Sequence, residues 1–79
     1  MHYVYILKSE KTPNHYVGAT SDLRLRLKDH NEGKQRFTQP HRPWTLAWYA
    51  GFPSKAKAMT FEKYLKSGSG HAFRNRHLI

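Results

Sequence analysis

The absence of cysteine from a chain of 79 residues is the feature that most restricts what this sequence can fold into. A chain of this length forms one domain at most, and a domain of about 60 residues buries only roughly 60% of the surface that its unfolded chain exposes. Many small domains compensate with disulfides or with zinc held by thiolates, and this sequence can form neither. We therefore predict that residues 1–79 form a single domain that depends on packed apolar and aromatic side chains.

The charged residues give the chain a strongly positive charge. Fourteen lysines and arginines stand against five aspartates and glutamates, for a formal net charge of +9. A positive potential over so small a surface attracts polyanions, whereas solubility alone requires less charge, of either sign. Nucleic acid is thus the predicted partner. The first apolar run is too short for a signal peptide and nothing approaches a membrane span, so we expect a cytoplasmic protein without membrane contact.

Two short β-strands are predicted near the N-terminus. Residues 2–8 are rich in β-forming side chains and end at the turn-like residues 9–14, which include Pro13. Residues 15–20 form a second run with similar composition. The two runs are close enough in sequence to pair as an antiparallel hairpin with a long loop.

Residues 21–32 are predicted to form a helix, although leucines and basic residues alternate in them as in an exposed strand. The ends of the segment favour the helix. Ser21 is a suitable N-cap, Asp22 suits the first turn, and Gly33 suits the position just beyond the last turn.

Two basic side chains lie on the apolar stripe of this helix. On a helical wheel, Arg26 and His30 share a face with Leu23 and Leu27, whereas Leu25 lies opposite. Both basic groups could flank the stripe and extend to solvent. Alternatively, they point into a polar pocket over the sheet, and the sequence leaves the two arrangements open.

The rest of the chain is predicted to contain a loop, a strand, a helix and a tail. Residues 33–44 carry prolines and several basic residues and are typical of a loop, and residues 45–51 follow as a third strand. A second helix begins at residues 53–54 and runs to about residue 67. The Gly-Ser-Gly stretch at residues 68–70 ends it, and a short basic tail follows.

Glu62 is the only acidic residue after Glu32 and lies among many lysines and arginines. On the second helix it shares a stripe with three apolar residues, Ala58, Phe61 and Leu65. Glu62 could form a surface ion pair with Lys66, worth roughly 0.2–0.5 kcal/mol. Alternatively, it holds a divalent cation, because Mg²⁺ prefers carboxylate ligands.

The order and spacing of these residues resemble the pattern of GIY-YIG nucleases. Tyr3-Val4-Tyr5 stands where the first triplet of the family falls, and Tyr16-Val17-Gly18 matches the second. Arg26 comes ten residues after the tyrosine of the second triplet, as in the signature of the first helix, which His30 continues. Glu62 stands where the family places its metal-binding glutamate. The resemblance covers nearly the whole chain and is closest to the short, stand-alone bacterial members.

This resemblance implies an α/β (α+β) GIY-YIG fold, in which a small three-stranded antiparallel sheet is flanked by helices. It also implies an endonuclease that hydrolyses DNA phosphodiester bonds with Mg²⁺ or Mn²⁺. Tyr3 departs from the family pattern by replacing the first glycine. Asn75 is a loose match to an asparagine that some members carry after the glutamate. Tyr3, Gly18 and Asn75 are therefore kept as possible site residues.

The resemblance assigns roles to five catalytic candidates. Glu62 would bind the metal ion, and Arg26 would hold the scissile phosphate with its fork of donors. Tyr5 and Tyr16 would position or deprotonate the attacking water. A free phenol has a pKa near 10 and is a poor base at neutral pH, so His30 or the metal would have to assist, and the sequence does not identify which tyrosine is the base.

Contacts to the DNA backbone are expected from basic residues of the loop and the tail, namely Lys34, Arg36, Arg42, Arg74 and Arg76. Phe37 or Trp44 could stack on an unpaired base, or Trp44 could belong to the core. The partner is expected to be DNA, whether single-stranded, duplex or branched, bound by a monomer or a transient dimer. The alternatives are a non-catalytic nucleic-acid-binding module and a structural protein of an RNA-rich particle.

Overall fold

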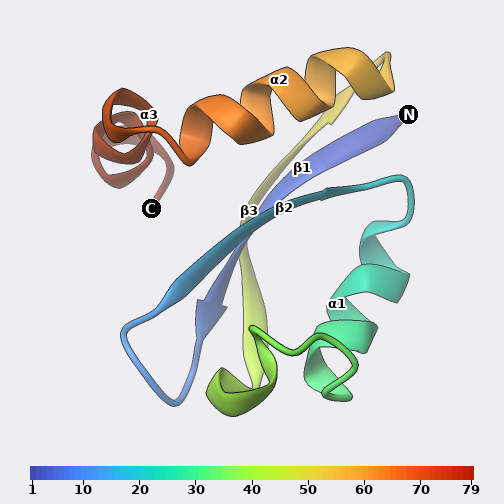
Figure 1. The fold of residues 1–79 in the computed structure, drawn as a ribbon, viewed down its shortest axis with the longest axis vertical. Coiled ribbons are helices and arrows are strands. Elements are labelled where there is room, and N and C mark those ends of the chain that lie inside the picture. The colour runs from blue at the N-terminus through green and yellow to red at the C-terminus, as the bar shows by residue number, and fades with distance from the viewer.

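The computed structural model describes residues 1–79 as a three-stranded antiparallel sheet with three α-helices (Figure 1). The strands are β1 (His2–Ser9), β2 (His15–Thr20) and β3 (Trp44–Phe52). The helices are α1 (Leu23–Asn31), α2 (Lys55–Leu65) and α3 (Gly68–Phe73), with a 3₁₀ turn η1 (Gln39–His41) and a π-helical turn η2 (Arg74–Leu78). The predicted fold class is confirmed. Each helix is too short and too polar to cross a membrane.

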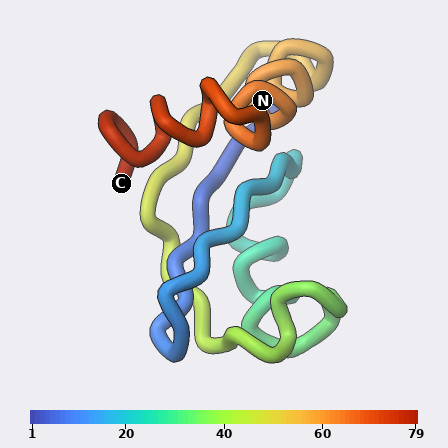
Figure 2. The backbone as a smooth tube through the Cα atoms, turned by 60° about the vertical axis from the view of Figure 1, so that its left-hand side comes forward, coloured from blue at the N-terminus to red at the C-terminus, as the bar shows by residue number.

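The sheet has the order β2-β1-β3, and helices cover both of its faces (Figures 1 and 2). Successive side chains of β1 alternate between these faces. Val4 and Ile6 pack in one cluster with residues of α2, whereas Tyr5 and Leu7 pack in another with the leucines of α1. The central strand therefore contributes to two small cores, one on each face.

A β-bulge in β3 changes which side chains face α1. Ile6 pairs with Trp48 but the next residue, Leu7, pairs with Leu46, so Ala47 is an extra residue on β3. Trp48 consequently packs on the α2 side and Leu46 on the α1 side, although an unbroken strand would place them on the same face. The bulge also directs Trp44 into the core beneath α1.

The ends of α1 correct one detail of the prediction and confirm another. Asp22, and not Ser21, is the N-cap, because its carboxylate accepts a hydrogen bond of 3.0 Å from the backbone N–H of Leu25. Gly33 has a φ of +79° and lies just past the helix, as predicted. Its N–H and that of the following residue donate to carbonyls of the last helical turn.

The predicted basic tail is wrong, because residues 68–78 are helical. Ser67 follows α2 and caps the next helix, since its hydroxyl oxygen accepts a hydrogen bond of 3.2 Å from the N–H of Gly70. Gly70 is buried against the end of α2, where a Cβ atom would overlap the backbone carbonyl of Tyr64. The glycines thus allow two helices to approach closely, in addition to ending α2.

We expect Gly70→Ala to lower the free energy of unfolding by roughly 1–3 kcal/mol, because the added methyl group collides with backbone that cannot rotate away. Gly68→Ala is the matched control, since no atom lies within 4 Å of the position that a Cβ atom would take there. That control should be neutral or stabilising by up to about 1 kcal/mol. Urea unfolding of the two variants measures the difference, and equal midpoints would contradict this account of the α2–α3 contact.

Candidate functional site

A buried chain of hydrogen bonds connects the sheet to α1 and to the loop that follows it. The Tyr5 hydroxyl lies 3.0 Å from His30 Nε2, and His30 Nδ1 lies 2.7 Å from Thr38 Oγ1. All three side chains are almost fully buried. The Thr38 hydroxyl donates to the carbonyl of Gln35, so its oxygen is free to accept from His30 Nδ1–H. His30 Nε2 then accepts the hydrogen bond from Tyr5.

His30 is held in its neutral form. Burial lowers its pKa below the ordinary value, and the nearby positive charge of Arg26 lowers it further, against a smaller opposing effect of Asp29. The sequence left open whether His30 extends to solvent or points toward the sheet. Because its ring is buried and hydrogen-bonded to Tyr5 of β1, it points toward the sheet. Leu25, predicted to lie on the opposite face, is 53% exposed.

Tyr5 is held in its neutral form as well. Burial raises the pKa of its hydroxyl, and the proximity of Tyr16 and Glu62 adds to this effect. The guanidinium of Arg26 acts in the opposite direction because it favours a phenolate. The charges of Arg26 and Glu62 thus both act on the Tyr5 hydroxyl, and the ring of Tyr16 lies beside that of Tyr5.

Gly18 provides the space that this arrangement requires. It pairs with Tyr5 across the β1–β2 ladder, and a Cβ atom at Gly18 would collide with the hydroxyl end of the Tyr5 ring. Any larger residue would therefore displace the ring and its hydrogen bond to His30. The possible site residue Gly18 is thus assigned a steric role.

Tyr16 lies beside this buried chain but is only half-buried. Its ring centroid is 4.9 Å from that of His30 and 6.4 Å from that of Tyr5. Because β2 is an edge strand, Tyr16 lies at the open border of the sheet. It is the tyrosine of the pair that is accessible from solvent.

Glu62 reaches this border from α2. Its side chain is 16% exposed, and Glu62 Oε2 lies 3.1 Å from Lys66 Nζ, which itself lies 5.8 Å from the centroid of the Tyr16 ring. The predicted ion pair therefore exists. This ion pair lies next to Tyr16, so the carboxylate of Glu62 is already bound to the positively charged ammonium group of Lys66.

The donor set at Glu62 fits a hydrated divalent cation. No group of three or more His, Asp and Glu side chains is positioned to hold a metal ion, so a cation bound here would rest on the single carboxylate of Glu62. Mg²⁺ commonly retains several waters and is held by one or two carboxylates together with substrate phosphates. A single carboxylate that already attracts an ammonium group is compatible with that mode of binding.

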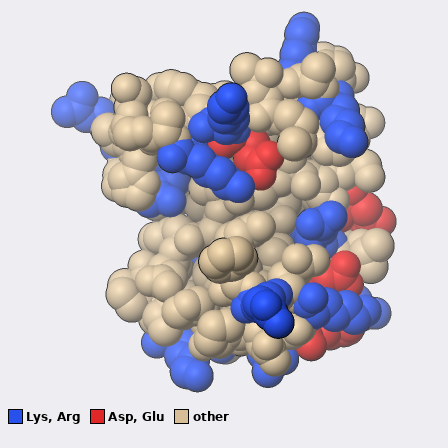
Figure 3. Space-filling model, in the orientation of Figure 1, with Lys and Arg blue, Asp and Glu red and all other residues tan.

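The five residues predicted to contact the DNA backbone come from two segments, the loop after α1 and the C-terminal turn η2. Lys34 is engaged by Asp29 at 3.6 Å and Glu32 at 3.3 Å, which hold it on the surface of α1. Two exposed arginines of the same loop, Arg36 and Arg42, are free of such pairs. Figure 3 shows the molecule in the orientation of Figure 1. Basic side chains are spread over the face in view and around a hollow between the half with α2 and α3 and the half with α1.

The remaining basic candidates lie on the C-terminal turn η2. Arg74 donates to Asn75 Oδ1 at 3.0 and 3.1 Å, and its charge lowers the pKa of His15 at the start of β2, after the larger effect of burial. Arg76 is exposed. Asn75 thus orients Arg74 and makes no hydrogen bond to Glu62. Tyr3, the other possible site residue, packs edge-on against Tyr49 at 6.2 Å.

Sequence reasoning missed Thr38 and assigned Lys66 only a surface role. Thr38 lies in a loop without periodicity, so nothing in the sequence marks it as the partner of His30. Lys66 could be found only from its spacing to Glu62. Trp44 is 4% exposed and donates its indole N–H to the Thr38 carbonyl at 2.9 Å, so it belongs to the core.

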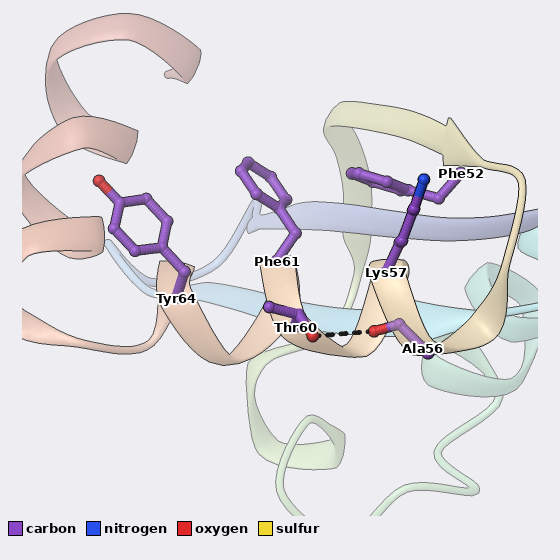
Figure 4. Close-up of a pocket in the computed structure, with 6 residues that line it drawn as sticks. All are labelled: Phe52, Ala56, Lys57, Thr60, Phe61 and Tyr64. Atoms are coloured by element: carbon purple, nitrogen blue, oxygen red, sulfur yellow. Dashed lines mark hydrogen bonds between the residues drawn. The ribbon is translucent and has the colours of Figure 1, made fainter.

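The most apolar groove of the molecule lies elsewhere (Figure 4). It lies along α2 and the end of β3 and is lined by Phe52, Ala56, Lys57, Thr60, Phe61 and Tyr64. Glu62 projects from a different side of α2, toward β2. This groove is therefore separate from the polar site around Tyr5.

We expect stability to fall as the pH drops below about 6.5, because the unfolded chain then binds a proton that the buried His30 resists. His30→Gln should remove that part of the pH dependence. Urea unfolding at about pH 7.5 and about pH 5.5 measures it. His77→Gln, at an exposed position, is the control. The pKa of His15 is also lowered, but His15 is unchanged in all the proteins compared, so its contribution cancels. An unchanged pH dependence in His30→Gln would contradict the assignment.

Comparison with known proteins identifies similar sequences. The profile described as the GIY-YIG catalytic domain matches residues 1–75. A UPF0213 protein of Streptococcus pneumoniae serotype 4 is 40% identical over 65 residues, which are 81% of this chain and 65% of that protein. The structure-specific endonuclease subunit SLX1 of Candida dubliniensis is 40% identical over 83 residues, covering 95% of this chain and 28% of that protein.

The chain therefore spans less than two thirds of the length of these two relatives. A solved structure supports the fold independently. The solution structure of the UPF0213 protein BH0048 from Bacillus halodurans superimposes with a TM-score of 0.57 and 36% sequence identity. The superposition covers 95% of this chain and 80% of that one.

Proposed function

The chain belongs to the GIY-YIG catalytic domain family, and from that premise we propose that residues 1–79 act as one divalent-metal-dependent endonuclease domain that hydrolyses DNA phosphodiester bonds. The observation that carries the proposal is that Tyr16 packs beside the buried Tyr5–His30 pair and that Lys66 links Glu62 to the Tyr16 ring. A module that only binds nucleic acid gains nothing from a carboxylate within a basic surface, since it repels phosphate. The non-catalytic alternative leaves Glu62 only the ion pair with Lys66.

Arg26 is assigned to the scissile phosphate. It lies on the face of α1 that is turned toward the sheet, and its charge acts on both Tyr5 and His30. A guanidinium presents a planar fork of donors that matches two phosphate oxygens, and it stays charged at any pH of interest. Arg26 would bind the phosphate in the ground state and oppose the negative charge that develops during cleavage.

Tyr16 is assigned to the attacking water. The Tyr5 hydroxyl donates a hydrogen bond to His30 in a buried site, and burial raises its pKa, so loss of its proton is disfavoured. Tyr16 is half-buried at the open edge of the sheet, where water has access. We assign Tyr5 and His30 to holding the Tyr16 ring and Arg26 in place.

Glu62 is the residue that would hold Mg²⁺ or Mn²⁺, and Lys66 would have to release the carboxylate. When bound, such an ion supplies electrostatic stabilisation of the charge that grows on the phosphate oxygens. Lys66 would remain close to the substrate, since its ammonium group lies near Tyr16 as well as Glu62.

DNA that contains unpaired or branched segments is the substrate that we propose. The relative SLX1 is named as a structure-specific endonuclease subunit, and the net charge of +9 suits any polynucleotide. A domain of this size has little surface for reading a long sequence. We propose that it acts as a monomer or as a transient dimer on duplex regions.

Glu62→Gln should reduce DNA cleavage by at least about a hundred-fold without weakening DNA binding in EDTA, because it removes the charge that attracts the cation but preserves the shape of the side chain. Glu32→Gln, at an exposed ion-paired position beside α1, is the control. Fluorescent single-stranded, duplex and branched DNA are incubated with Mg²⁺, Mn²⁺ or EDTA. Cleavage that persists in EDTA or in Glu62→Gln would overturn the metal assignment, and tight binding by wild type without any cleavage would favour the non-catalytic module.

Tyr16→Phe should slow cleavage by roughly 10²–10⁴-fold, as expected for loss of a general base. Tyr5→Phe should slow it less but lower the free energy of unfolding by roughly 1–3 kcal/mol, because it leaves His30 Nε2 buried without a donor. Single-turnover cleavage and urea unfolding are measured on both variants. A folded Tyr5→Phe protein that is slower than Tyr16→Phe would reverse the assignment of the two tyrosines.

A further inference from the structure

A smaller cavity adjoins Tyr16, and Glu62 is not among the residues that line it. Its volume is about 190 Å³, and its walls come from the β1–β2 hairpin and from the loop after α1. Tyr16, Phe37 and Trp44 supply aromatic surface, and Asn14 and His41 supply polar groups. One part of the cavity wall is therefore aromatic, and another part carries groups that can form hydrogen bonds.

Phe37 is the most unusual residue of this cavity. Its side chain is 86% exposed, although burying a phenylalanine normally stabilises a protein by about 1.5–3 kcal/mol. The backbone that carries it is nevertheless fixed, because the next residue, Thr38, is 1% exposed and bonded to His30. The backbone N–H of Gln39 also donates to the carbonyl of Gln35 at 3.0 Å. The fold thus presents an unburied aromatic ring from a rigid loop.

The polar wall of the cavity is also held in place. Asn14 Nδ2 lies 3.2 Å from His41 Nε2, and His41 Nδ1 lies 3.2 Å from Thr12 Oγ1. Asn14 is exposed, so its amide retains a donor and an acceptor for another molecule. Donors and acceptors beside an aromatic surface suit a heteroaromatic ring better than an aliphatic side chain.

We propose that this cavity binds one unpaired base of single-stranded DNA, next to the phosphate that is cleaved. The inference rests on the proposed nuclease function, since Tyr16 both lines the cavity and is assigned to the attacking water. Phe37 would stack on the base, and the amide of Asn14, held by His41, would bond to its edge. A base within a duplex is paired and stacked on both sides and cannot enter.

The charges around the cavity match a nucleic-acid strand. Arg36 directly precedes Phe37 and is exposed. A strand whose base enters the cavity would carry a phosphate past Arg36. The same arrangement is unfavourable for an acidic or neutral protein segment that lacks a planar ring, because Phe37 and Tyr16 offer flat aromatic surfaces.

The test compares Phe37→Leu with Tyr64→Leu, which removes an exposed aromatic ring from the separate groove on α2 (Figure 4). Affinities for a single-stranded oligonucleotide and for its duplex are measured by fluorescence anisotropy in EDTA. Phe37→Leu should weaken single-strand binding by roughly five- to one-hundred-fold, as for loss of one stacked base, and leave duplex binding unchanged. Tyr64→Leu should change neither.

A fluorescent adenine analogue placed along the oligonucleotide locates the bound base, since stacking quenches its emission. Quenching should occur next to the cleaved bond in wild type and be lost in Phe37→Leu. The proposal is overturned when Phe37→Leu leaves single-strand affinity unchanged or weakens duplex binding to the same extent. Wild-type cleavage is recorded in parallel with Mg²⁺. If Phe37→Leu weakens single-strand binding but the wild type does not cleave DNA, the base site is supported and the nuclease function is contradicted. If the wild type cleaves DNA but Phe37→Leu binds single strands as tightly as the wild type, the nuclease function is supported and the base site is contradicted.

Discussion

The hydrogen bond between the Tyr5 hydroxyl and His30 Nε2 joins the central strand to α1 inside a region closed to water. An unpaired polar group there would cost roughly 1–3 kcal/mol, a large share of the stability of so small a domain. Each end of the bond is therefore completed by another element: Gly18 leaves room for the phenol, and Thr38 accepts the second imidazole N–H. No buried side-chain nitrogen or oxygen lacks a partner.

The same requirement explains why β3 contains a bulge. The extra residue at Ala47 directs Trp44 toward α1, where its indole N–H donates to the Thr38 carbonyl. Thr38 is thereby held where it can accept from His30. The change of register in β3 thus helps to position the loop that carries Thr38. Thr38 in turn favours the tautomer of His30 that has its proton on Nδ1.

Features that follow from local periodicity could be predicted from the sequence. The three strands, the inward face of α1 with His30 and the apolar stripe that carries Glu62 are of this kind, because alternation and helical spacing depend on neighbouring residues. Thr38, the bulge and the helical C-terminus could not be predicted, since each depends on contacts between distant segments. Gly70 illustrates the limit: a glycine that normally ends a helix here permits the next helix to pack against α2.

The two faces of the sheet serve different purposes because the central strand alternates between them. Val4 and Ile6 face an apolar core with α2, which stabilises the domain, while Tyr5 faces a hydrogen-bonded core with α1. Glu62 belongs to a helix on the apolar face, and its partner Lys66 lies over the ring of Tyr16 on the edge strand β2. A fourth strand added at β2 would cover Tyr16 and separate Glu62 from it. The free edge, a hazard for aggregation in most small sheets, is here the place where the proposed substrate enters.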